Sequence, residues 1–238
     1  MPYKEIDSPH NPLFKEIEDI KKGKKKKEGL VFIEGEDLVN EAMATNHLKT
    51  ALAVNPLLLP KDHDGLIVSE HLYDRLAQFK SPAKLMGIAE IDLTNEPGDK
   101  CIYLDGVQDP GNVGTIMRTA LSFQYSSVFL SIDSASPFNS KTIQASKGAI
   151  FKIPIGQAKL SYLKDKGYNI YLTSLKGADE SKYSELKKPF ALVFGNEGRG
   201  VSEENLKLGP NLRIEMSGID SLNVAIAAGI LMYRFHKS

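Results

Sequence analysis

Residues 192–200 combine amino-acid types that suit a small-molecule site. An apolar strand, Leu-Val-Phe, leads directly into a loop that holds three glycines, one carboxylate and one arginine. Glycine lets backbone N–H and C=O groups approach a ligand closely. The spacing of Gly195, Gly198 and Gly200 matches neither the dinucleotide fingerprint nor the P-loop motif. We therefore predict another kind of ligand pocket at the carboxyl end of this strand, where open α/β sheets bind ligands.

A second segment, residues 104–120, places a Pro-Gly turn between a strand and a helix. Asn112 follows the turn, where an asparagine can cap the helix or serve a ligand site, and the residues alone leave both interpretations open. Arg118 lies further along the helix among apolar residues: Val113, Ile116, Met117, Ala120 and Leu121. An arginine in such surroundings costs desolvation free energy unless an anion or a carboxylate meets it. We therefore predict an anionic partner for Arg118.

A third segment, residues 214–225, breaks a strand at Ser217-Gly218 and then begins the last helix. Ser221 stands where that helix starts, so it is predicted either as the N-cap or, with Asn223, as a residue that faces a ligand. The last helix, residues 222–235, is apolar on nearly all sides. A helix of this kind is buried on most sides. Burial inside one subunit and burial at a subunit interface are both open.

Strands alternate with helices along the whole chain, which predicts an α/β protein with a mostly parallel sheet. The polar, turn-rich residues 94–100 separate a smaller α/β unit, residues 1–95, from a larger one, residues 96–238. In the larger unit we expect strands near 101–105, 126–131, 168–173, 190–194 and 211–215, and helices over 113–123, 139–147, 158–166, 202–207 and 222–235.

The composition excludes several classes of protein. The single cysteine, Cys101, rules out an intrachain disulfide and a cysteine-based zinc site, and no metal is expected. No apolar run reaches membrane-spanning length, and the N-terminus has no apolar signal segment, so a cytoplasmic protein is expected. The net charge is zero, so nucleic-acid binding has to be argued from local patches. One patch is the lysine-rich run of residues 21–27, which is either a solvated loop or a phosphate-binding segment.

Together, the three segments resemble the three motifs of the SpoU/TrmH family of RNA ribose 2′-O-methyltransferases, within the SPOUT superfamily. Residues 112–120 match its N-x-G-x-x-x-R-T-A pattern, and residues 195–202 match its G-x-E-x-x-G-[V/M]-[S/R] pattern. Residues 214–229 resemble the third motif, which begins I-P-M and continues S-L-N-V, except that Glu215 replaces the proline. Residues 1–95 look like the RNA substrate-binding α/β domain often found ahead of this catalytic domain.

The resemblance implies a C-terminal trefoil knot, a homodimer whose two subunits complete each site, and S-adenosylmethionine as cofactor. The implied substrate is a ribose 2′-hydroxyl, and the family favours ribosomal RNA over transfer RNA. The alternatives are a tRNA 2′-O-methyltransferase and, from another class, a catalytically inactive RNA-binding homologue. The residues that match the catalytic positions are Arg118, Asn112, Glu197, Ser221 and Asn223. Those expected around the cofactor are Thr173, Gly195, Asn196, Gly198, Ile214, Met216, Leu222 and Val224.

Overall fold

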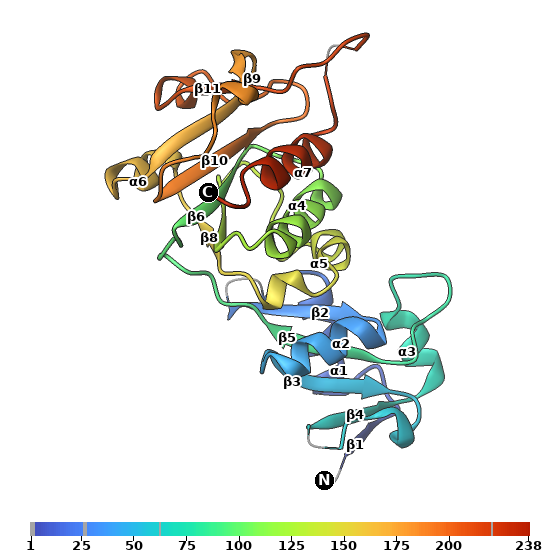
Figure 1. Ribbon diagram of the computed structural model, residues 1–238. Helices are drawn as coiled ribbons and strands as arrows, with labels where there is room; N and C mark the ends of the chain where they lie inside the picture. Colours follow the sequence, from blue (N-terminus) through green and yellow to red (C-terminus); the bar gives the residue numbers. More distant parts are fainter. Residues whose placement is uncertain (1–2, 26–27, 62, 220) are drawn as a thin grey trace.

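A computed structural model describes residues 3–25, 28–61, 63–219 and 221–238. It contains two β-sheets, one at each end of the molecule, with helices packed against both (Figure 1). None of the described helices has the length and apolarity that a membrane crossing requires.

The N-terminal sheet has five strands in the order β1-β4-β3-β5-β2. Its β1, β4 and β3 are parallel, whereas β5 runs antiparallel to both β3 and β2. Strand β1 was not predicted from the sequence, because three residues carry too little pattern. The elements of this part are β1 (Lys4–Ile6), α1 (Pro12–Lys21), β2 (Leu30–Glu34), α2 (Glu36–Ala44), β3 (Leu48–Ala53), η2 (Pro56–Leu58), β4 (Gly65–Val68), α3 (Glu70–Leu76) and β5 (Met86–Glu90).

The C-terminal sheet has six strands in the order β11-β9-β10-β6-β7-β8, and every pair in it is parallel. This confirms the prediction of a mostly parallel sheet. Its elements are β6 (Lys100–Asp105), α4 (Pro110–Ser122), β7 (Ser127–Leu130), α5 (Ser140–Ser146), η3 (Ala149–Phe151), β8 (Ile155–Gln157), α6 (Leu160–Asp165), β9 (Asn169–Asp179), η4 (Glu180–Lys182), β10 (Phe190–Gly195), η5 (Asn205–Lys207), β11 (Asn211–Arg213) and α7 (Val224–Arg234).

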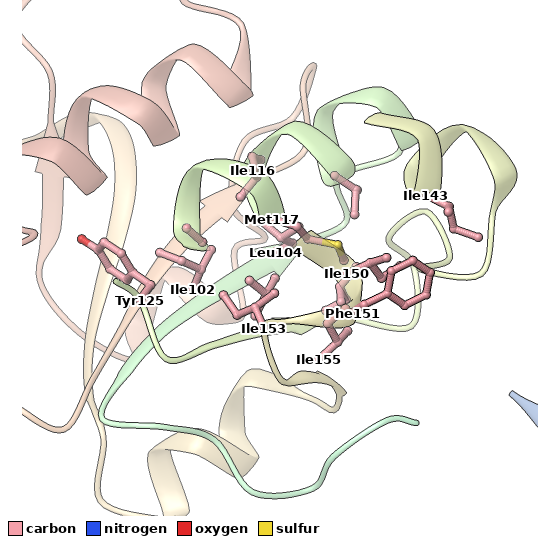
Figure 2. Packing of buried hydrophobic residues seen from close by; sticks show 14 of the residues in the cluster. Ile102, Leu104, Ile116, Met117, Tyr125, Ile143, Ile150, Phe151, Ile153 and Ile155 are labelled. Carbon is pink, nitrogen blue, oxygen red and sulfur yellow. The ribbon is translucent and has the colours of Figure 1, made fainter. Parts of the chain in front are cut away.

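The central strands of this sheet are buried on both faces, as parallel strands covered by helices must be. On one face, Ile102 and Leu104 of β6 pack under Ile116 and Met117 of α4 (Figure 2). On the other face, the alternate residues of β6 belong to a separate cluster that includes Leu160 and Leu163 of α6. Helices α4, α5 and α7 therefore cover one face, and α6 helps to cover the other.

The structure corrects several local predictions. The predicted helix over 202–207 is only the short 3₁₀ turn η5, and strand β8 was missed. Helix α4 is capped by Asp109, whose side chain accepts the backbone N–H groups of Gly111 and Asn112, so Asn112 is not the cap. Helix α7 is capped by Asn223 rather than by Ser221.

Side chains near β2 and α2 join the two sheets. The side-chain amide of Gln144 in α5 donates to the carbonyl oxygen of Glu34 at 2.7 Å, and Lys152 pairs with Glu41. The isolated bridge between Leu93 and Ile155 adds a backbone link near the predicted boundary. The division into domains 1–95 and 96–238 stays a prediction, as does the trefoil knot.

Candidate active site

A cavity of about 520 Å³ opens at the carboxyl end of β10, beside the middle of β9 (residues 173–176), β11 and the start of α7. Every residue predicted to surround the cofactor lines it: Thr173, Gly195, Asn196, Gly198, Ile214, Met216, Leu222 and Val224. The volume suits a ligand of nucleoside size. Phe194, Leu212 and Leu231 supply apolar walls, and backbone groups of the glycine loop lie among them.

Asn196 holds the glycine loop in shape. Its side-chain oxygen accepts the backbone N–H groups of Gly198 and Arg199 at 3.0 and 3.1 Å, and its amide donates to the carbonyl of Gly106 at 2.8 Å. Two backbone hydrogen bonds between Asn196 and Gly200 close the loop. The loop is therefore a fixed wall of the cavity, fastened to the strand end of β6.

Gly195 is required by this closure. A Cβ atom there would overlap the backbone of Gly200 and Val201, closer than real Cβ atoms approach. Only hydrogen fits between the end of β10 and the returning loop. Glycine is therefore needed here for a close approach of the chain to itself, whereas the close approach of this loop to a ligand stays a prediction.

Glu197 belongs to a hydrogen-bond network that joins the three predicted motifs. Its carboxylate accepts the side-chain amide of Asn112 at 3.0 Å and the backbone N–H groups of Gln108 and Asp109 at 3.2 Å. The amide of Asn223 in turn donates to the side-chain oxygen of Asn112 at 3.1 Å. Three segments distant in the sequence thus meet through the three side chains Glu197, Asn112 and Asn223.

The network keeps Glu197 ionised. Burial alone would raise the pKa of this carboxyl, but the hydrogen bonds from Asn112 and from the backbone of Gln108 and Asp109 outweigh it. The net effect lowers the pKa of Glu197 below its ordinary value of 4.5. Because an ionised carboxylate can only accept, the side-chain NH₂ group of Asn112 must face Glu197. The side-chain oxygen of Asn112 is then free to accept the hydrogen bond from Asn223.

The remaining predicted catalytic residues lie apart from the network. Ser221 lines the cavity, and its side chain forms no hydrogen bond with any of the residues that the structure describes. Arg118 is exposed on α4 and does not line the cavity. The expectation that it lies buried among apolar neighbours is therefore wrong, because α4 turns Val113, Ile116 and Met117 inward and Arg118 outward.

Two features of the site were not predicted. Asp105, buried at the end of β6, accepts the backbone N–H of Ser202 at 2.8 Å and fastens the chain that leaves the glycine loop. Its place after an apolar strand was the available signal. Lys176 and Arg213 also line the cavity, and no sequence pattern pointed to them, whereas Arg199, which lines it too, belongs to the glycine loop noted in the sequence.

The lysine run is mostly engaged within the chain. Lys21 donates to the carbonyls of Arg75 and Ala77, at the end of α3. Lys22 pairs with Glu18, Lys24 with Asp19, and Lys25 with Glu28. Lys26 and Lys27 lie outside the described residues. These contacts favour the interpretation of the run as a structural, solvated segment.

Several known proteins are similar to this chain in sequence and in fold. The chain is 34% identical over 246 residues to the 23S rRNA (guanosine(2553)-2′-O)-methyltransferase RlmP of Bacillus subtilis, covering 97% of this chain and 98% of that protein. The AdoMet-bound rRNA methyltransferase from Sinorhizobium meliloti superposes with a TM-score of 0.84 at 29% identity, over 98% of this chain and 97% of the other.

A TrmH-family protein from Porphyromonas gingivalis, described as a putative RNA methyltransferase, superposes with a TM-score of 0.82 at 31% identity, over 94% of this chain and 97% of the other. The sequence model of the SpoU rRNA Methylase family matches residues 99–233, which include the cavity, the glycine loop and the Glu197 network. The chain therefore belongs to the SpoU rRNA methylase family.

Proposed function

We propose that this protein transfers a methyl group from S-adenosylmethionine to the 2′-hydroxyl of a guanosine in 23S ribosomal RNA. The observation that carries this proposal is the meeting of the three predicted motifs at one place: the second and third line the cavity, and Asn112 of the first is hydrogen-bonded to Glu197 and Asn223. The full-length similarity to RlmP supports the choice of RNA and of nucleotide. A ribosomal substrate also supports action in the cytoplasm, where ribosomes assemble.

The cavity fits the cofactor. Gly195, Ile214 and Leu222 line it, and their backbone groups would read the edge of an adenine ring while apolar side chains would hold the faces of the ring. Thr173, at the end of the buried part of β9, lines the same cavity and would bound the ligand from the neighbouring strand. When bound, the cofactor supplies an electrophilic methyl group on a sulfonium.

The protein's own residues would position the ribose and absorb its charge. A ribose hydroxyl must lose its proton as it attacks, so a nearby fixed positive charge favours the reaction. A guanidinium group effectively never acts as a base in a protein, so the role of Arg118 would be to bind the adjoining phosphate and stabilise the alkoxide. Ser221 and the network of Asn112, Glu197 and Asn223 would orient the substrate.

Arg118 would serve the cavity of a second subunit. Within its own chain it lies about 9 Å along α4 from Asn112, by the rise of the helix, and outside the cavity. Helix α7, which packs against α4, leaves Ile226, Ile230 and Tyr233 exposed at 56%, 39% and 65%. An exposed apolar face of this kind favours a subunit interface, and a homodimer would carry the partner's Arg118 to each site.

Methyl transfer from labelled cofactor to unmodified 23S rRNA tests the proposed activity, and mapping 2′-O-methyl groups locates the nucleotide. Arg118→Ala is expected to abolish transfer while cofactor affinity stays unchanged. Transfer to tRNA alone would overturn the proposed substrate. The absence of transfer to any RNA would favour the inactive RNA-binding homologue.

Mixing two inactive variants tests the shared site. One variant is Arg118→Ala, and the other is Asn112→Ala, which breaks the network while keeping Arg118. Since half of randomly paired dimers are mixed and each of these has one intact site, activity should return to about a quarter of the wild-type value. If Arg118 acts within its own chain, the mixture stays inactive.

A further inference from the structure

The loop between α3 and β5 carries an exposed aromatic ring flanked by cations. Phe79 is 52% exposed, and Lys80 and Lys84 are exposed on the same loop. A phenylalanine on the surface is unremarkable by itself. An aromatic ring beside lysines, however, has the two components of a single-stranded nucleic-acid contact, a stacking platform and phosphate-binding charges.

A buried carboxylate holds this loop in place. Glu34, only 1% exposed, accepts the backbone N–H of Gln78 at 2.6 Å and that of Ala83 at 3.2 Å. The hydroxyl of Tyr73 donates to the carbonyl of Ala83 at 2.9 Å, and Lys21 donates to the carbonyl of Ala77 at 3.1 Å. Both ends of the loop are therefore fastened, so Phe79 is presented from a fixed base and loses little conformational entropy on binding.

The same glutamate joins the loop to the C-terminal part of the molecule. Its backbone carbonyl accepts the amide of Gln144 in α5. Lys141 is exposed one helical turn before Gln144, and residues three apart share a helix face. A Cβ on Gly114 of α4 would lie 2.7 Å from the Cβ of Ala145, so α5 packs closely on the helix that carries Asn112 and Arg118.

The lysines of this surface differ from those of the lysine run. Within the described part of the chain, Lys80, Lys84 and Lys141 form no ion pair, whereas Lys22, Lys24 and Lys25 each contact a carboxylate. A lysine already paired with a carboxylate gains less from a phosphate than an unpaired one does. The unpaired cations, rather than the most conspicuous run in the sequence, are the ones available to an RNA.

We propose that Phe79, Lys80, Lys84 and Lys141 form a second RNA contact, which binds a stretch of the substrate away from the methylated nucleotide. An unpaired base stacks on Phe79, and the lysines bind the flanking phosphates. The proposal rests on the proposed function for the identity of the RNA. Because α5 packs on α4, the contact fixes the substrate relative to the cavity.

The test measures binding of an unmodified 23S rRNA transcript that spans the proposed guanosine, at several salt concentrations. The variant Lys80→Gln/Lys84→Gln/Lys141→Gln should lower the slope of log affinity against log salt by about 2, since each phosphate contact to a single strand contributes about 0.7. The matched control Lys22→Gln/Lys24→Gln/Lys25→Gln removes equal charge from the lysine run and should leave the slope nearly unchanged. Equal slopes for the two triple variants would overturn the proposal.

The ring is tested separately. Phe79→Ala should weaken binding about 5- to 140-fold, the range of aromatic–base stacking, and Phe79→Tyr should retain the wild-type affinity. Because Phe79 is exposed, neither change should alter the thermal unfolding midpoint. Wild-type affinity in Phe79→Ala would refute the stacking contact.

Methyl transfer at saturating RNA separates this inference from the proposed function. If the contact is correct, the lysine triple variant raises KM for RNA without lowering kcat. Wild-type protein that methylates no RNA would refute the proposed function, while the binding slopes would still decide the second contact.

Discussion

Replacing the three glycines of the 195–200 loop by alanine, one at a time, should distinguish three reasons for glycine. These are a clash of the new Cβ with the backbone, a strained backbone angle, and no structural requirement. Gly195→Ala places a Cβ against the backbone of Gly200 and Val201, and the loop must open to accept it. Overpacking typically costs about 1–3 kcal/mol, and the two Asn196–Gly200 hydrogen bonds that open with the loop add about 1 kcal/mol each. We expect a total loss of about 3–5 kcal/mol.

The other two glycines provide graded controls. Gly200 has φ +72° with open space around it, so Gly200→Ala pays only the left-handed backbone cost of about 1–2 kcal/mol. A Cβ on Gly198 meets only the side-chain oxygen of Asn196, at 3.6 Å, an ordinary contact. Gly198→Ala should therefore stay within about 0.5 kcal/mol of the wild type.

Calorimetric titration with S-adenosylmethionine and thermal unfolding measure these differences. The cavity wall in Gly195→Ala is displaced, so cofactor affinity should fall at least about 30-fold, the equivalent of about 2 kcal/mol. The unfolding midpoint should fall in the order Gly195→Ala, then Gly200→Ala, then Gly198→Ala, by about 2–4 °C per kcal/mol. Wild-type cofactor binding by Gly195→Ala, or a larger effect of Gly198→Ala, would refute the closure argument.

Three further changes probe the rest of the structure. The pKa of Glu197 is lowered in the folded state, so its ionised form stabilises the protein above pH 4.5, and this contribution is lost as pH falls through the folded pKa. The difference in unfolding free energy between wild type and Glu197→Gln should therefore be constant at neutral pH and shrink below pH 4.5. Glu34→Ala leaves the N–H groups of Gln78 and Ala83 without their acceptor and should cost about 2–4 kcal/mol in urea unfolding, whereas Glu34→Gln, which keeps one acceptor oxygen, should cost less. Gly114→Ala forces α4 and α5 apart at Thr142 and Ala145 and should lower stability by about 1–3 kcal/mol; a stabilised variant would mean that helix propensity outweighs the clash.

The cavity could be predicted from the sequence because its residues lie on contiguous motifs at strand ends. Parallel strands bring their carboxyl ends to one edge, so Gly195, the last residue of β10, and Thr173 on the neighbouring β9 had to lie near each other once both strands were recognised. The glycine loop could also be predicted from the sequence, since the hydrogen bonds that close it join residues only a few positions apart.

Other features depend on tertiary contacts that no local pattern contains. Asn112 looked like a helix cap, but Asp109, three residues earlier, takes that role and leaves Asn112 to Glu197. Arg118 has apolar neighbours in sequence, yet the helical period turns it away from them. The lysine run attracted attention by composition, whereas the pairing of each lysine follows from the fold.

The side chain of Asn223 forms hydrogen bonds with two distant parts of the chain. Its side-chain oxygen caps the first turn of α7 at the N–H groups of Ala225 and Ile226, and its amide holds Asn112. If the outer face of α7 joins two subunits as proposed, any tilt of that helix on assembly displaces the side chains proposed to orient the ribose. Ligand binding in the cavity must then change the dissociation constant of the dimer by the same factor by which dimerisation changes the affinity for the ligand, since linkage between two equilibria is reciprocal.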